Sequence, residues 1–173
     1  KDIVKDGETV SVGGSMTLFE TKIIDFLRSG RYNFLDRYKE NLTQTDLKEI
    51  YRKSFSANTY FASANAITEE GEIFNVDGNG NRVAAILYGP DKVILIVGVN
   101  KIVKNIDEAI KRNKDISGPA NAKRLNLQTP CAKVGYCMDC KSKDRICCEY
   151  TVIKRQRNEN RIHVIFVNDN LGF

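Results

Sequence analysis

The longest unbroken apolar stretch of the chain spans residues 93–99 and reads Val-Ile-Leu-Ile-Val-Gly-Val. A strand that faces water on one side alternates apolar and polar residues, whereas this stretch has no polar side chain. Its composition is typical of a strand in a sheet that is covered on both faces, as parallel sheets are. This segment therefore favours an α/β fold for the chain.

The rest of the sequence alternates between strand-like and helix-like segments, which is the α/β pattern. Further strands are expected at residues 10–12, 59–63, 72–76, 151–153 and 162–167. Helices are expected at residues 17–29, 43–55, 83–88, 105–117 and 120–125, with connections at 31–42 and 65–71. We predict one α/β domain over residues 1–173, built on an open, mainly parallel sheet with helices on both faces. A cysteine-rich insertion is expected at about residues 129–149.

The first candidate ligand loop is the turn formed by Gly13, Gly14 and Ser15, which follows a strand and precedes a helix. Glycine lets the backbone approach a ligand closely, and free N–H groups at the start of a helix favour an anion. Many strand-to-helix turns are glycine-rich for packing alone, so the tripeptide leaves both interpretations open.

The second candidate loop spans residues 65–82 and concentrates polar and turn-forming residues. Its candidate ligand-binding residues are Asn65, Asn75, Asp77, Gly78, Asn81 and Arg82. One interpretation is a hairpin with Asp-Gly and Asn-Gly turns. The other is a polar loop at the carboxyl ends of strands, where open α/β sheets bind ligands, with Arg82 able to clamp a carboxylate or phosphate. In that case both loops should face one cleft.

All five cysteines lie between residues 131 and 148, and four of them have the spacing C-x5-C-x2-C-x6-C. These four are Cys131, Cys137, Cys140 and Cys147. An odd, clustered set without a visible export signal argues against a disulfide framework. Four thiolates at short spacing suit an iron–sulfur cluster or zinc, and we predict a metal centre here. Redox-active thiols and disulfides remain the alternatives.

The net charge of +5 is confined to the segment that carries the cysteines. Residues 1–122 hold 17 Lys/Arg and 17 Asp/Glu, whereas residues 123–161 hold ten Lys/Arg and four Asp/Glu. The cations could form a solvated face, or offset an anionic metal–thiolate centre. The absence of Trp and the few interleaved aromatic residues disfavour a nucleic-acid partner.

Two further observations narrow the possible functions. His163 is the only histidine, so a hydrolytic triad or a histidine-based metal site is hard to assemble. No apolar stretch approaches the roughly 20 residues that span a bilayer. With no export signal visible, the sequence predicts a cytoplasmic protein that does not enter a membrane.

Taken together, these motifs resemble the lactate-utilisation LUD domain family, also called YkgG-like, in its cysteine-containing form from anaerobic bacteria. The resemblance covers nearly the whole chain. Its main carriers are Val-Gly-Gly-Ser at 12–15, Asp-Arg at 36–37, Asn-Ala-Ile-Thr at 65–68, Asn-Val-Asp-Gly at 75–78, Gly-Asn-Arg at 80–82, Asn-Lys-Ile-Val at 100–103, Asn-Ala-Lys-Arg-Leu at 121–125, the cysteine segment at 129–147 and Ile-His-Val-Ile at 162–165.

The resemblance implies a fold similar to the sugar-isomerase and CoA-transferase superfold, which is Rossmann-like. It implies that both polar loops line the ligand cleft and that Cys147, not Cys148, is the fourth metal ligand. Isomerase relatives carry an acid where this chain has Asn65, and Asp77 is the nearest substitute. The family's redox partners favour iron–sulfur over zinc.

Two functions are compatible with these features. In the first, the protein is an accessory or redox component of organic-acid (lactate) utilisation, which binds a small anionic ligand and works with iron–sulfur partner subunits. In the second, it is a small-molecule enzyme that acts on a phosphorylated or carboxylated substrate and carries structural zinc. Fold alone does not choose between them.

Overall fold

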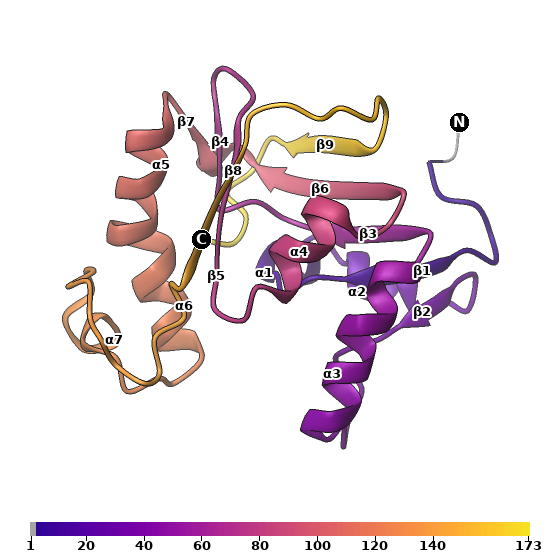
Figure 1. Cartoon of the computed structure of the whole chain (residues 1–173), viewed down its shortest axis with the longest axis horizontal. Coiled ribbons are helices and arrows are strands. Elements are labelled where there is room, and N and C mark those ends of the chain that lie inside the picture. The colour runs from indigo at the N-terminus through magenta and orange to yellow at the C-terminus, as the bar shows by residue number, and fades with distance from the viewer. Residues whose placement is uncertain (1–2) are drawn as a thin grey trace.

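The protein is built on a five-stranded parallel sheet, which runs across the middle of the view in Figure 1. The computed structural model describes residues 3–173. The strand order is β2-β1-β3-β6-β9. These strands are β1 (Thr9–Val12), β2 (Asn33–Leu35), β3 (Thr59–Ala62), β6 (Lys92–Gly98) and β9 (Ile162–Val167). The predicted α/β class and parallel sheet are confirmed, while β2 lies in a stretch where only a connection was expected.

Both faces of this sheet are buried, as the apolar segment at residues 93–99 predicts. Alternate residues of β6 point to opposite sides, and Ile94 and Ile96 are only 2% and 5% exposed. One face packs against α4 (Asn81–Tyr88) through a cluster that includes Leu95 and Ile86. The other face packs against α1 (Met16–Glu20) and α2 (Ile23–Leu27). Helices therefore cover both faces of the sheet.

A second, four-stranded sheet stands beside the first, and its strands run across the direction of the first sheet in Figure 1. Its order is β7-β4-β5-β8, with β7 (Ile102–Val103), β4 (Ala66–Thr68), β5 (Ile73–Asp77) and β8 (Glu149–Ile153). The sequence did not predict this sheet. The expected connection at residues 65–71 contains β4, whose three residues are too few to display an alternating pattern, although all three are buried.

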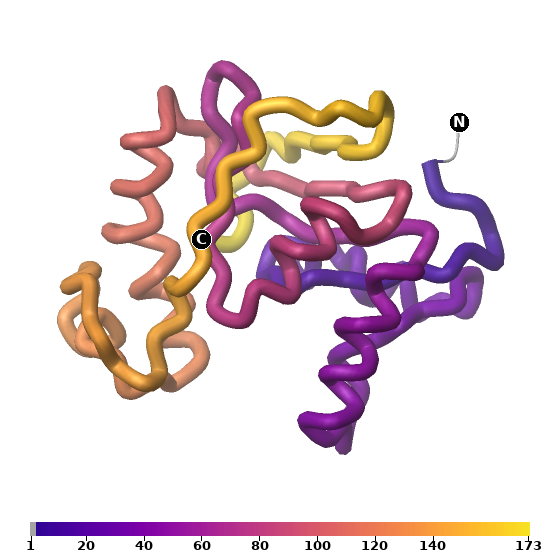
Figure 2. The backbone as a smooth tube through the Cα atoms, in the orientation of Figure 1, coloured from indigo at the N-terminus to yellow at the C-terminus, as the bar shows by residue number. Residues whose placement is uncertain are grey.

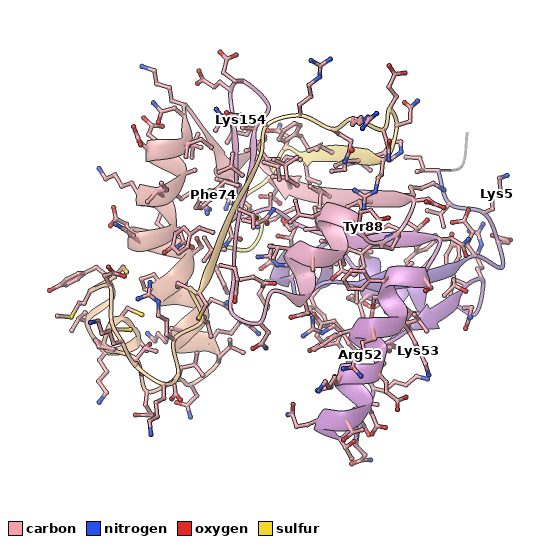
Figure 3. All side chains as sticks on the ribbon, in the orientation of Figure 1. Lys5, Arg52, Lys53, Phe74, Tyr88 and Lys154 are labelled. Carbon is pink, nitrogen blue, oxygen red and sulfur yellow. The ribbon has the colours of Figure 1, made fainter. Side chains whose placement is uncertain are left out.

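A long helical segment covers the outer side of the second sheet (Figure 2). It comprises α5 (Ile106–Arg112), the π-helical turn η3 (Asn113–Ser117) and α6 (Gly118–Arg124). Phe74 of β5 packs against this segment (Figure 3). The predicted helix break at Gly118 and Pro119 is wrong. A π-turn precedes the proline, which lacks an N–H donor, and the helix continues past it.

The helix expected at residues 17–29 is also wrong in detail, because it forms two short helices. Ser15 caps α1, two residues before the expected start, and its hydroxyl accepts a hydrogen bond from the N–H of Leu18. Lys22 then adopts a left-handed conformation, which ends the first helix before α2 begins. Helix α3 (Gln44–Lys53) has the expected capping box between Thr43 and Asp46. The remaining short helices are η1 (Ser54–Ser56), η2 (Val99–Lys101) and α7 (Pro130–Val134).

The order of the parallel sheet determines where a ligand can bind. Counting only its own strands, the order is 2-1-3-4-5, that of doubly wound folds with a switch point between the first and third strands. The helices that follow β1 cover one face, and α4 covers the other. A crevice therefore opens at the carboxyl ends of β1 and β3. Among the described residues, no helix is long and apolar enough to cross a membrane.

Arg161 provides a test of how the parallel sheet is held to α4. Its buried guanidinium donates hydrogen bonds to the carbonyls of Ala85, Ile86 and Pro90. Arg161→Ala should lower the free energy of unfolding, measured by urea denaturation, by about 2–3 kcal/mol, since it leaves these acceptors without a charged donor. The exposed Arg157 is the control, and Arg157→Ala should change the value by less than about 0.5 kcal/mol. Equal effects of the two substitutions would contradict this account.

Candidate functional site

A cleft of about 250 Å³ lies at the carboxyl ends of the parallel strands. The segments that follow all five strands contribute to its lining. The lining residues are Gly14 and Ser15 after β1, Arg37 after β2, Ser63 after β3, Lys101 after β6, and Gly172 and Phe173 after β9. The cleft therefore occupies the switch point of the sheet, where this topology places ligands.

The opposite wall comes from the second sheet and from the helical segment. From the loop at residues 65–82, the cleft is lined by Asn65, Val76, Asp77, Gly78, Asn79, Asn81 and Arg82. From the helical segment, it is lined by Ser117, Asn121, Arg124 and Leu125. The two loops predicted from the sequence thus face one cleft. Gly13 and Asn75 are not part of its lining.

Arg82 does not act as the free anion clamp that its position in the loop suggested. Its guanidinium donates hydrogen bonds of 2.7–3.2 Å to the carbonyls of Ser63 and Val76 and to the amide oxygens of Asn65 and Asn75. Its Nε lies 3.5 Å from the Asp77 carboxylate. Because every donor is engaged within the protein, Arg82 serves to position the loop around it.

The candidate acid Asp77 and the candidate turn residue Ser15 also have local partners. One carboxylate oxygen of Asp77 accepts hydrogen bonds from the backbone N–H groups of Arg82 and Val83, at 3.0 and 3.3 Å. Asp77 therefore caps α4, a role that holds its carboxylate in place. Ser15 caps α1, which has only five residues and so contributes a small helix dipole at the cleft.

Two of the candidate glycines are explained by close packing. A Cβ atom at Gly13 would lie 3.0 Å from the Cγ of Arg82 and 3.1 Å from the Tyr60 hydroxyl. A Cβ atom at Gly78 would lie 3.2 Å from the Cα of Ile146, so the cysteine segment passes directly against this loop. Side chains at either position would displace a wall of the cleft.

Sequence reasoning missed Lys101, the most unusual ionisable group in the cleft. The side chain is only 3% exposed, and its Nζ donates hydrogen bonds to the hydroxyls of Thr17 (2.9 Å) and Ser63 (3.1 Å). Its pKa is lowered to about 8, mainly by burial and also by Arg112 and Arg82, against a raising effect of Glu20. The only sequence signal was its place in the 100–103 segment, immediately after the apolar stretch.

Arg37 is a second cation that the sequence did not single out as a site residue. It lies over the rings of Tyr38 and Tyr51, 5.4 and 4.7 Å from their centroids. Within residues 3–173 its guanidinium makes one hydrogen bond, to the Tyr51 hydroxyl at 2.7 Å. Its Nη1 lies 3.5 Å from the position that a Cβ atom at Gly14 would take. Arg37 therefore offers unused donors at the edge of the cleft.

Three cysteines approach one another beside α6. Cys147 is half-buried, packs near Phe74, and lies within van der Waals reach of Gly118. The pKa of the Cys147 thiol is raised to about 11, mainly by burial and also by the Cys137 and Cys131 thiols, against a lowering effect of Arg145. The backbone N–H of Asp139 donates a hydrogen bond to the sulfur of Cys137 at 3.3 Å. These thiols are therefore near neighbours in space.

Arg145 holds the rest of the cysteine segment together. It donates hydrogen bonds to the carbonyls of Cys140 (2.6 Å) and Cys147 (2.9 Å), and it pairs with Asp139 at 2.9 Å. Cys148 is exposed, and its thiol donates to the carbonyl of Arg145. In the part of the chain from residue 3 onward, no three Cys, His, Asp or Glu side chains are arranged to hold a metal ion. The metal centre therefore stays a prediction.

The cysteine segment also forms part of the cleft. Ile146 lines it, and the backbone N–H of Cys148 donates to the carbonyl of Asp77 at 2.9 Å. On the other side, Ser117 lines the cleft and bonds to Asn113, whose side chain hydrogen-bonds Cys147. The cysteines and the ligand cleft therefore share a wall.

Arg82 provides a test of how the cleft is positioned. Arg82→Ala removes the donors to Ser63, Asn65, Asn75 and Val76, and should lower the free energy of unfolding by about 3 kcal/mol in urea denaturation. Arg82→Lys should restore only part of this loss, because an ammonium does not reproduce the planar fork. Arg52→Ala, on the exposed side of α3 (Figure 3), is the control. Wild-type stability of Arg82→Ala would contradict the positioning role.

Comparison with models of protein families agrees with the resemblance found in the sequence. Among the solved structures that match, one described as a DUF162 family protein from Deinococcus radiodurans has a TM-score of 0.41 and 14% sequence identity, and the match covers 94% of this chain and 88% of that chain. No curated protein matches. The family model for the LUD domain matches residues 1–167. Since this match covers nearly the whole chain, the protein belongs to the LUD domain family.

Proposed function

We propose that the cleft binds a small carboxylate of organic-acid metabolism, L-lactate or its oxidation product, and that the protein is an accessory or redox component of lactate utilisation. Membership of the LUD domain family associates the chain with lactate utilisation. The proposal adds a ligand class, a binding site and a metal centre to that association.

The observation that carries the proposal is the lone buried ammonium of Lys101. Its hydrogen-bond partners are two neutral hydroxyls, and among the described residues no carboxylate lies within ion-pair distance of its Nζ. A buried charge without a counter-ion is costly, so an anion that enters the cleft would gain a strong partner. Four cationic side chains and one carboxylate line the cleft, which favours anions in general.

The size of the cleft narrows the ligand class. Pockets for drug-sized ligands usually measure about 300–1,000 Å³, and this cleft has about 250 Å³. A three-carbon acid fits that volume, whereas a dinucleotide does not. Arg37 has free N–H donors and could hold the carboxylate from the cleft edge, because guanidinium groups bind carboxylates through two parallel hydrogen bonds.

We further propose that Cys131, Cys137, Cys140 and Cys147 bind an iron–sulfur cluster, with zinc as the alternative. The donor set fits, because thiolates are the usual ligands of both. The Cys131 and Cys137 thiols lie close enough to act electrostatically on the Cys147 thiol, and Arg145 bonds to the carbonyls of Cys140 and Cys147. An iron–sulfur cluster would supply electron transfer to partner iron–sulfur subunits, whereas zinc would stabilise the segment.

The alternative is an enzyme that acts on a phosphorylated or carboxylated substrate and carries structural zinc. Lys101 and the unused donors of Arg37 would accept a phosphate as well as a carboxylate. Affinity for inorganic phosphate above that for L-lactate, together with bound zinc, would favour this function over the first.

Ligand binding is tested by calorimetry with L-lactate, pyruvate and the neutral analogue lactamide. The two acids should bind and lactamide should not, because only the acids supply a negative charge. Lys101→Met should weaken binding of both acids about 10- to 100-fold, since it removes a charged partner. Lys104→Met, at an exposed site three residues away, is the control. Failure of both acids to bind the wild-type protein would remove the proposal.

The pH dependence of binding is a further check. Lys101 is cationic below a pKa of about 8, so carboxylate affinity should be highest below that pH and decline as pH rises through it. The charged groups that face Lys101 are Arg112 on α5, Arg82 on α4 and Glu20 on α1. The Lys101→Met variant should lose this decline.

Metal binding is tested on protein purified without oxygen, by iron, zinc and acid-labile sulfide analysis with visible absorption. The wild-type protein should hold iron and sulfide. Cys147→Ser should lose them, because it removes the half-buried thiol that lies near Cys131 and Cys137. Cys148→Ser, which changes the exposed neighbouring thiol, should retain them. Metal-free wild-type protein, or equal loss in the two variants, would count against the assigned ligand set.

A further inference from the structure

We propose that Lys101 is a nucleophile that captures the carbonyl group of a 2-oxo acid as an imine inside the cleft. The inference rests on the proposed function, because it uses the same cleft, and it names the reactive residue and the substrate class. A 2-hydroxy acid such as lactate has no carbonyl group at that carbon, so it would bind in the cleft without reacting.

The ionisation of Lys101 suits this reaction. An amine attacks a carbonyl only in its neutral form, and enzymes obtain neutral lysines by burial and by neighbouring cations. Both causes act here, and the pKa of Lys101 is lowered to about 8. At pH 7.5 about a quarter of such side chains are neutral, compared with about one in a thousand for a lysine of ordinary pKa.

The two hydroxyl groups around Nζ fit the proton transfers that the reaction requires. Nζ adds to the carbonyl carbon, and a proton from nitrogen passes to the carbonyl oxygen to give a carbinolamine. That hydroxyl then leaves as water, taking a second proton, as the carbon–nitrogen double bond forms. The Thr17 and Ser63 hydroxyls lie 2.9 and 3.1 Å from Nζ and can relay both protons. The reaction needs no oxidant or reductant.

The surroundings of Lys101 limit the access of water and restrict the direction from which a substrate can reach its amine. A Cβ atom at Gly172 would lie 3.1 Å from Nζ and 2.7 Å from the Thr17 hydroxyl, so the backbone after β9 closes directly over the amine. Lys101 is nevertheless one of the residues that line the cleft. Arg37 lines the same cleft, and its guanidinium could hold the carboxylate while the 2-oxo carbon reacts with Lys101.

The experiment is reductive trapping. Wild-type protein is incubated with isotopically labelled pyruvate at saturating concentration and cyanoborohydride, then digested and mapped by mass spectrometry. The label should appear on Lys101 as a stable secondary amine and be absent without reductant. Its rate of formation should rise with pH through about 8, as the neutral amine becomes the main form. L-lactate under the same conditions should leave no label.

Two variants separate a nucleophile from a simple cation. Lys101→Arg keeps a positive charge at this position but cannot form the imine, so it should lose the label. Lys104→Arg, at the exposed control site, should be labelled at Lys101 like the wild-type protein. If Lys101→Arg does not fold, the peptide map of the wild-type protein still identifies the labelled lysine.

The possible outcomes distinguish this inference from the proposed function. Pyruvate that binds in calorimetry without any label on Lys101 would overturn the imine and leave the carboxylate site intact. A label spread evenly over exposed lysines would also overturn the imine proposal. So would an equal amount of label on the Lys101→Arg variant. Absence of pyruvate and lactate binding would overturn both proposals together.

Discussion

The buried guanidinium of Arg82 is the interaction on which the cleft depends. It connects the carbonyl that follows β3 to the side chains and backbone of β5, and so ties the parallel sheet to the second sheet. A buried cation that bonds four neutral acceptors and one carboxylate has few alternative arrangements, because each lost bond leaves a desolvated group. Arg82 therefore helps to hold the two sheets, and the cleft that both of them line, in place.

A second constraint joins the cleft to the cysteine segment. Gly78 lies in contact with the backbone of Ile146, Asp77 accepts a hydrogen bond from Cys148, and Gly118 lies beside the sulfur of Cys147. A change in the arrangement of the thiols would move the same backbone that lines the cleft. Metal binding to these cysteines would therefore be linked energetically to ligand binding, since the two events share contacts and linkage is reciprocal.

The sequence predicted those features that local pattern determines. The apolar stretch at 93–99 identified the buried strand, and the helix expected at residues 43–55 corresponds to α3. The second sheet was missed because β4 and β7 have only three and two residues, and because its β5–β8 pairing joins segments far apart in the chain. Both polar loops were placed correctly at one cleft. The role of Arg82 was not, because nothing in the sequence reveals that its acceptors lie around it.

The difference between order along the chain and arrangement in space also explains the result of counting charges. The count drew attention to the cysteine segment and not to the cleft. The first 122 residues are neutral overall, so their cations attracted no attention beside the basic cysteine segment. Yet Lys101, Arg82 and Arg37 all come from this neutral part. Acidic residues from the same part of the chain form ion pairs with other cations: Asp36 with Arg28, and Glu8 with Lys92. The electrostatic field in a cleft depends on which charged groups are buried there without an ion-pair partner. The net charge of a segment does not contain that information.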